Sequence, residues 1–264
     1  MPSFYWDEGR MRLDGAMPSI LAIGDSWFWY PMPGGSLLET LGTIVAPKGH
    51  VIFALGNNGA EIYDYVDGKY RKLVRNALRL YGDGLSAVFI SGGGNDFAGF
   101  NDVRPMLKPD CSGATQASDC FIAGTAHRTL GWLMNRVTEN YNRLIGQIRM
   151  TSNPGVLIVL HNYDNALPSG KAVFPGGEAW FKPAFDDARV PAGLQQDCLL
   201  HVLDQFTTVV DGFANASGGQ ITVVHSRGTL GPNNWANELH PTAAGFARIA
   251  NTAWHPVLAN LGLA

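Results

Sequence analysis

Residues 19–27 read SILAIGDSW, and the predicted fold rests on this pattern. Ser19 to Gly24 is a short apolar run that ends in glycine, which is typical of a strand buried on both faces. Asp25 and Ser26 follow at once. A strand-to-helix turn at that point would expose a side chain at the sheet edge and leave backbone N–H groups free. The segment therefore predicts a core strand that ends beside an exposed serine.

Four further apolar runs repeat this pattern along the chain. We expect strands at Val51–Leu55, Leu85–Ser91, Val156–His161 and Ile221–His225. Helical patterns lie between and after them, at 36–45, Glu61–Tyr81, 129–151, 191–216 and Pro241–Leu261. In the last of these helices Pro241 would lie in the first turn and Pro256 would introduce a kink. Regular alternation of strand and helix predicts an α/β fold with a five-stranded parallel sheet.

The length of 264 residues and the apolar content of 46% fit one domain over residues 1–264. Two long irregular stretches, at about 97–127 and 162–188, are interpreted as loop insertions in that domain. Only 16% of the residues are charged, the net charge is -3, and Lys and Arg do not cluster. The sequence therefore predicts no nucleic-acid partner.

Other features of the sequence bear on location. No apolar run reaches the roughly 18 residues that a membrane span needs, and residues 1–18 lack the apolar stretch of a signal peptide. The three cysteines, Cys111, Cys120 and Cys198, are an odd number. Together these features predict a cytoplasmic protein. Export without a cleaved signal, a Cys111–Cys120 bridge and the oligomeric state are left open.

Polar side chains follow the predicted strands at the ends where ligands bind in parallel sheets. Ser26 follows the first strand, Gly59 the second and Asn95 the third. His161 ends the fourth strand, and His240 lies on the loop after the fifth. Because the carboxyl ends of parallel strands meet at one edge, these groups are expected to converge on one site.

The same positions carry a family resemblance. Gly24-Asp25-Ser26, Gly59, Gly94-Asn95-Asp96 and His240-Pro241 resemble, in order, the four sequence blocks of the SGNH/GDSL hydrolases. The resemblance implies a flavodoxin-like, three-layer α/β/α sandwich. It also implies that Ser26 is the nucleophile, that His240 is its general base, and that an oxyanion hole is formed by the N–H groups of Ser26 and Gly59 and the side-chain amide of Asn95.

The chemistry of these groups agrees with that reading. A serine hydroxyl is a weak nucleophile unless a base removes its proton, and a histidine titrates in the range needed to do so. We therefore expect a rate profile that rises through roughly neutral pH as His240 loses its proton. No spacing of His, Cys or carboxylates is typical of a zinc site, so no metal and no cofactor are predicted.

One position departs from the family pattern, which has Asp three residues before the histidine. Here that residue is Asn237. Its carbonyl oxygen can orient the ring of His240, but it cannot stabilise an imidazolium by charge. The carboxylate of Glu238, one residue further on, is an alternative. We favour Glu238 or a backbone carbonyl as the support for the ring, with Asn237 as a local orienter, and leave the third member of the triad open.

Aromatic residues near the predicted site suggest how a substrate would be held. We expect Trp27, Phe97, Trp180 and Phe181, together with His161 at the strand end, to bind substrate as the two long loops cover the cleft. Packing beneath the loops is an equally good reading of the same aromatics. Asp25 and Asp96 are expected to brace local backbone.

Three functions remain in view. The first is a serine hydrolase acting on small-molecule carboxylic esters of small to medium acyl, lipid or aryl type. The second is a carbohydrate O-acetyl esterase that uses the same groups. The third is a non-catalytic binding domain that has kept the fold, which only Asn237 favours.

Overall fold

The computed structural model describes residues 2–29 and 35–264. A six-stranded sheet forms its centre, with strand order β1-β3-β2-β4-β5-β6 and every neighbouring pair parallel. The strands are β1 (Phe4–Tyr5), β2 (Ile20–Gly24), β3 (Ile52–Gly56), β4 (Ala87–Ser91), β5 (Leu157–His161) and β6 (Ile221–Val224). The predicted parallel sheet is confirmed, with one strand more than expected. The edge strand β1 was missed because two residues are too few to show a pattern.

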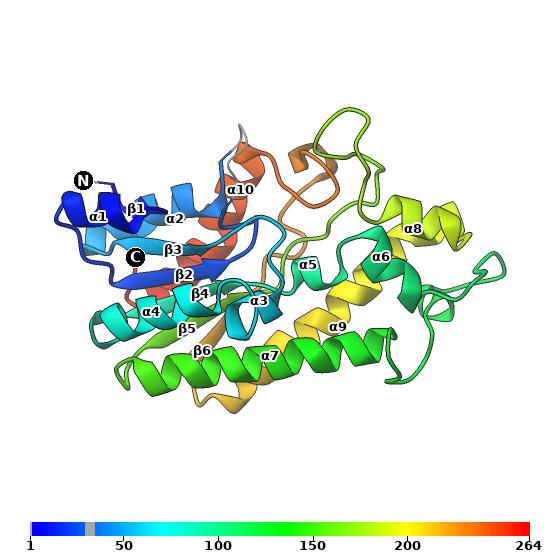
Figure 1. Ribbon diagram of the computed structural model, residues 1–264. Helices are drawn as coiled ribbons and strands as arrows, with labels where there is room; N and C mark the ends of the chain where they lie inside the picture. Colours follow the sequence, from blue (N-terminus) through cyan, green and yellow to red (C-terminus); the bar gives the residue numbers. More distant parts are fainter. Residues whose placement is uncertain (1, 30–34) are drawn as a thin grey trace.

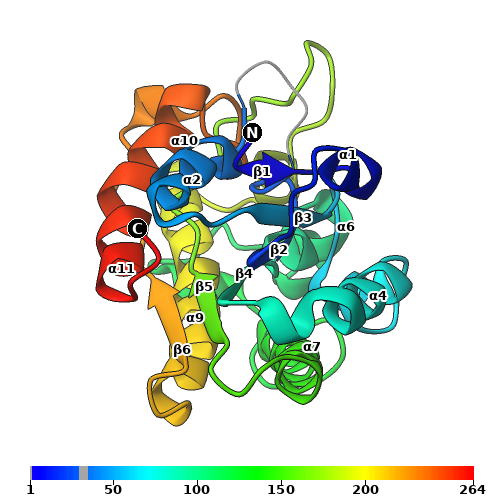
Figure 2. The same ribbon diagram turned by 90° about the vertical axis from the view of Figure 1, so that its left-hand side faces the viewer.

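Helices cover both faces of the sheet, so the predicted α/β/α layering is confirmed (Figures 1 and 2). On one face α2 (Leu37–Val45) packs with α10 (Ala243–Ile249) and α11 (His255–Asn260). On the other face α7 (Leu130–Thr151) packs against α3 (Ile62–Val66), α4 (Arg71–Tyr81) and α9 (Gln195–Ala216), among others. The short α1 (Glu8–Leu13) precedes β2. Burial of the strands between these layers explains why they are continuous apolar runs.

The segment 61–81 forms two helices instead of the single one predicted. Helix α3 ends at Val66, where the N–H groups of Asp67 and Gly68 both donate to the carbonyl oxygen of Tyr63, at 3.0 and 3.1 Å. Gly68 is a poor helix former, and the backbone turns there before α4 begins at Arg71.

The closing helix also differs from the prediction. Pro241 lies outside the helix and forms an isolated bridge with Trp235, and Thr242 is the N-cap whose hydroxyl accepts the N–H of Gly245 at 3.1 Å. Between α10 and α11 the chain makes a π-helical turn, Ala250–Trp254, and Pro256 falls in the first turn of α11. The wider turn accommodates a proline that has no N–H to donate.

The two long loops lie at the end of the sheet where the strands terminate (Figure 1). The first follows α5 (Gly94–Phe97) and contains α6 (Phe100–Val103) and a bridge between Leu107 and Phe121, and the second contains α8 (Lys182–Asp187). The three cysteines are buried free thiols. Within residues 2–29 and 35–264, the helices lack the combination of length and apolar character that a membrane span requires.

Close contact between β2 and β3 generates a stability prediction. Gly56 pairs with Gly24, and a Cβ at position 56 would collide with the carbonyl oxygen of Gly24. We expect Gly56→Ala to lower the free energy of unfolding by about 3 kcal/mol, because neither backbone can move aside in the sheet. Gly84→Ala is the control, since no atom lies within 4 Å of its Cβ position. Equal urea midpoints for the two variants would contradict the prediction.

Candidate active site

The first and last blocks of the sequence meet at the carboxyl edge of the sheet. Ser26 lies two residues beyond β2, and His240 lies on the loop that follows β6. The Oγ atom of Ser26 is 2.7 Å from Nε2 of His240, although 214 positions separate the two residues. Both side chains are buried, with exposed fractions of 6% and 4%, so the expectation of an exposed serine is wrong. A hydroxyl and an imidazole at this distance have the geometry that a nucleophile and its base need.

Asn237 makes the contact to the other ring nitrogen of His240. Its Oδ1 atom is 3.0 Å from Nδ1 and also accepts the backbone N–H groups of Leu239 and His240, each at 2.9 Å. Those two N–H donors fix which end of the amide faces the ring. Since a carbonyl oxygen only accepts, Nδ1 carries the hydrogen, and Nε2 is left to accept from Ser26.

Glu238 faces away from this pair, so the expected preference for Glu238 as the ring support is wrong. Its buried carboxylate accepts backbone N–H groups from one loop, those of Gly170 (2.8 Å), Trp180 (2.7 Å), Phe181 (2.7 Å) and Lys182 (3.2 Å). Four donors compensate for the cost of burying the charge. Glu238 therefore anchors the 162–188 loop beside His240.

Burial governs the basicity of His240. Removal of the ring from water lowers its pKa to about 4, because the charged form loses hydration. The neighbouring Asn237 supplies no negative charge to oppose this shift. The imidazole is therefore neutral, and able to accept a proton, well below the roughly neutral pH at which the sequence predicted activity to rise.

The predicted oxyanion groups lie around Ser26. Gly59 has φ of +70° and is exposed, and it lines the same cavity as Ser26, Asn95 and His240. The Nδ2 atom of Asn95 donates to the carbonyl oxygen of Ala60 at 3.0 Å, which ties α5 to the loop after β3. An amide nitrogen carries two hydrogens, so this bond leaves one for a ligand. The structure thus brings together all four groups named by the sequence.

A buried network beneath Ser26 includes one residue that the sequence analysis missed, Tyr163. Its hydroxyl donates to Asp25 at 2.5 Å and accepts the N–H of Gly94 at 3.1 Å. Asp25 also accepts the N–H of Trp27 (3.0 Å) and the hydroxyl of Ser91 (2.8 Å). Tyr163 therefore joins the serine turn to the loop that carries Asn95. In the sequence, its place two residues after the predicted strand Val156–His161 is a signal that could have marked it, and in the structure its φ is +56°.

Two carboxylates, the buried Asp25 and the half-buried Asp96, brace the turns, as expected. Asp25 is fully buried, and desolvation raises its pKa to about 6 although three donors surround it. Asp96 accepts the N–H of Ile62 at 3.0 Å, and burial raises its pKa to about 7. Both side chains hold backbone segments in place at the sheet edge.

His161 was expected in the substrate pocket, and this expectation is wrong. The side chain is completely buried, its Nε2 atom lies 2.8 Å from Oγ of Ser91, and its ring packs against Trp27, Phe28 and Trp254. Burial lowers its pKa to about 3. As the last residue of β5, it points into a helix-covered layer, and the cavities beside Ser26 are not lined by it.

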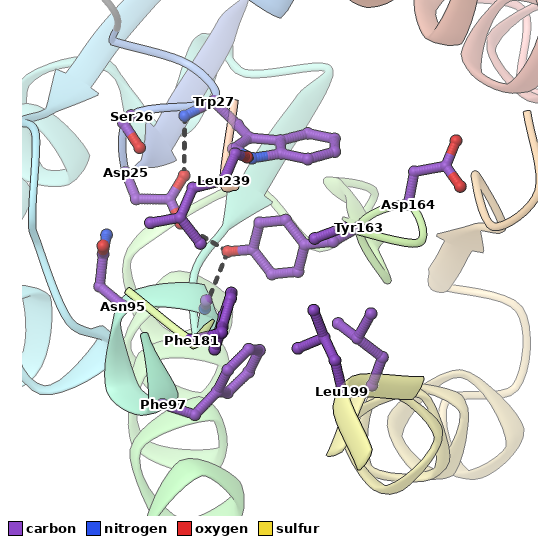
Figure 3. A pocket seen from close by; sticks show the side chains of 13 residues that line it. Asp25, Ser26, Trp27, Asn95, Phe97, Tyr163, Asp164, Phe181, Leu199 and Leu239 are labelled. Carbon is purple, nitrogen blue, oxygen red and sulfur yellow. Dashed lines mark hydrogen bonds between the residues drawn. The ribbon is translucent and has the colours of Figure 1, made fainter. Parts of the chain in front are cut away.

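Two cavities meet at Ser26. The inner cavity is the smaller of the two and is lined by Trp27, Phe97, Tyr163, Ala166, Phe181, Leu199 and Leu203 among others. The outer cavity is lined by Asn58, Gly59, Val173, Phe174, Trp180 and His240 among others. Both include Ser26, Asn95 and Leu239. Figure 3 shows the inner cavity, with Phe97 and Leu199 on the side away from Ser26.

The four aromatic residues predicted to bind substrate each line one of these cavities. Trp27, Phe97 and Phe181 border the inner cavity, and Trp180 borders the outer one with its ring edge-on to His240 at 5.8 Å. The indole N–H of Trp27 donates to the carbonyl oxygen of Leu239 at 3.0 Å. Among the residues that the structure describes, His, Cys, Asp and Glu side chains do not gather in any group of three suited to a metal.

Comparison with solved structures identifies the fold. A lipase, Lip_vut3, from a goat rumen metagenome has a TM-score of 0.58 at 12% identity, covering 94% of this chain and 98% of that one. An extracellular lipase from Streptomyces rimosus has a TM-score of 0.55 at 17% identity, covering 92% and 99%. A phospholipase A1 from Streptomyces albidoflavus has a TM-score of 0.51 at 17% identity, covering 93% and 99%. The fold expected from the SGNH/GDSL resemblance is confirmed.

Comparison of sequences gives much less. No protein-family model matches the chain. A curated tryptophan–tRNA ligase from Clostridium longisporum is 30% identical over 104 residues, which are 37% of this chain. The match covers 30% of that protein, so it involves a minor part of both chains.

The bridging position of Tyr163 generates a kinetic prediction. We expect Tyr163→Phe to lower kcat about ten- to a hundredfold with little change in KM, because the ring stays in the cavity wall while the serine turn and the Asn95 loop lose their shared anchor. The free energy of unfolding should fall by about 2 kcal/mol, since Asp25 loses a hydrogen-bond donor. Tyr63→Phe, at an exposed position, is the control. A proportional rise in KM with unchanged kcat would count against this positioning role.

The contact between Asn237 and His240 generates a pH prediction. A carboxylate at position 237 would favour the imidazolium, so we expect Asn237→Asp to raise the pKa of His240 and move the acid limb of kcat/KM up by about one pH unit or more. We also expect kcat at pH 8 to rise about tenfold, since the developing positive charge gains a partner. Asn233→Asp, exposed on the same loop, should do neither. An unmoved acid limb would show that Asn237 does not govern the ring.

Proposed function

We propose that the chain is a serine hydrolase of carboxylic esters that works through an acyl-enzyme on Ser26. The observation that carries this proposal is the hydrogen-bonded series Ser26 Oγ, His240 Nε2, His240 Nδ1 and Asn237 Oδ1. Each member has the atom type its role needs, and Asn95 and Gly59 border the same cavity. The fold, which resembles that of proteins named lipase and phospholipase A1, supports the proposal.

The reaction follows from these positions. Ser26 Oγ attacks the ester carbonyl carbon while its proton passes to Nε2 of His240. The carbonyl oxygen becomes an anion that the N–H groups of Ser26 and Gly59 and the amide of Asn95 stabilise. The C–O bond to the alcohol then breaks, and the alcohol leaves with the proton from His240. Water adds to the acyl-enzyme by the same route, giving the carboxylic acid and restoring Ser26.

The residues that line the two cavities beside Ser26 suggest which esters the protein hydrolyses. Apolar and aromatic side chains line most of the inner cavity, which fits small to medium acyl groups of lipid or aryl esters. Trp180 and Asn58 in the outer cavity also fit a sugar alcohol, so a carbohydrate O-acetyl esterase is the second candidate. Three buried free thiols support a reducing compartment, and we place the enzyme in the cytoplasm.

A fluorophosphonate probe tests the proposal directly. We expect covalent labelling of the wild type on Ser26, no labelling of Ser26→Ala, and labelling slowed at least about a hundredfold in His240→Ala, since the hydroxyl then lacks its base. Ser112→Ala, at an exposed serine, is the matched control and should label like the wild type. Mass spectrometry of the labelled peptide gives the site. An unlabelled wild type would favour the non-catalytic binding domain.

A further inference from the structure

The two cavities at Ser26 differ in their relation to His240. Both include Ser26 and Asn95, so a carbonyl group held at the serine would extend one arm into each. His240 borders the outer cavity and is not part of the inner lining. The two parts of an ester need different groups around them. The alcohol must receive a proton as it leaves, whereas the acyl group needs none. The position of His240 therefore indicates which cavity receives the alcohol and which receives the acyl group.

We propose that the inner cavity binds the alkyl chain of the acid and the outer cavity binds the alcohol, so that the preferred substrates are esters of a slender, unbranched acid with a bulkier, flat alcohol. The inference rests on the proposed function and assigns each arm of the substrate. His240 Nε2, which lies 2.7 Å from Ser26 Oγ, then faces the leaving oxygen and can return the proton to it.

The lining of the inner cavity suits a hydrocarbon chain. Its two carboxylates are already occupied by protein donors. Asp25 accepts from Tyr163, Ser91 and Trp27, while Asp164 accepts three backbone N–H groups, those of Asn165, Gly228 and Leu230. Nearly all of the remaining surface is apolar and buried, contributed by Phe97, Ala166, Phe181, Leu199 and Leu203. A polar group entering here would lose its hydration without finding a partner, whereas methylene groups gain from burial.

The outer cavity has a different character. It is the larger of the two, and several of its residues are exposed, including Asn58, Gly59 and Phe174, whose side chain is 62% exposed. Half-buried Trp180 offers an aromatic face beside His240, and Asn58 offers an amide. An aryl or sugar alcohol can stack on such a ring and remain partly hydrated. The outer cavity thus tolerates bulk that the inner cavity excludes.

Two substrate series and three variants test the assignment. The acyl series is 4-nitrophenyl acetate, butyrate, hexanoate and octanoate, and the alcohol series is methyl, phenyl and 2-naphthyl acetate with an acetylated glucoside. Ala166→Leu fills the inner cavity, Leu203→Ala enlarges it, and Phe174→Ala opens the outer cavity. Gln205→Ala, exposed on α9 beside Leu203, is the control. Melting temperatures establish that each variant folds.

We expect opposite effects from the two inner variants. Ala166→Leu should lower the ratio of kcat/KM for hexanoate to that for acetate about tenfold, and Leu203→Ala should raise the ratio for octanoate to hexanoate by at least about threefold. Ratios within the alcohol series should stay within about twofold of the wild type for both. Phe174→Ala should change the alcohol ratios and leave the acyl ratios alone. If Ala166→Leu does not fold, Leu203→Ala still decides the direction.

The outcomes separate this inference from the proposed function. A wild type that neither labels with fluorophosphonate nor hydrolyses any member of either series overturns the proposed function. An active, labelled wild type in which the inner variants alter the alcohol ratios, or in which Phe174→Ala alters the acyl ratios, overturns only the assignment of the arms. Equal effects of the inner variants on both series would also overturn it.

Discussion

The hydrogen bond between Ser26 and His240 is the contact on which the rest of the site depends. It requires the end of β2 and the loop after β6 to reach the same edge of the sheet, although strands β3 to β6 and helices α2 to α9 lie between them in the chain. Parallel strands with helical crossovers bring this about, because every carboxyl end then faces the same way. The order β1-β3-β2-β4-β5-β6 places β2 next to both β3 and β4, so the turns that carry Gly59 and Asn95 flank the serine.

Buried carboxylates hold these turns without facing the reacting atoms. Asp25 gathers three donors beneath the serine, and Glu238 gathers four backbone N–H groups from a single loop. In each case fixed N–H and O–H donors compensate for the buried carboxylate. These hydrogen bonds restrict the conformations of the loops and fix the positions of the side chains at the site. Tyr163 links the two turns that need the closest alignment. The side chains that hold these turns are thus different from the side chains proposed to react.

The sequence predicted the fold and the contact between Ser26 and His240, but it predicted the surrounding contacts poorly. Five strands appear as apolar runs because both faces are buried, whereas β1 depends on pairing with β3, which no local pattern reveals. Ser26, Gly59 and Asn95 lie just beyond strand ends and His240 lies on the loop after β6, so topology determines the edge of the sheet at which they meet. The choice between Asn237 and Glu238 depends on loop conformation, because adjacent residues point in different directions there. His161 was misplaced for the same reason, since a strand end allows either face.

The placement of Glu238 next to Asn237 has a consequence for how such a protein can diversify. The carboxylate accepts N–H groups from Gly170 and from Trp180, Phe181 and Lys182. Residues 171–179 therefore form a loop whose two ends are held together by one side chain. Insertions or deletions inside that loop would reshape the rim near Phe174. The two ends of the loop, and the nearby imidazole of His240, would keep their positions. The length of this segment can therefore vary at the rim of the cavity without breaking the hydrogen bonds that Glu238 makes at its two ends.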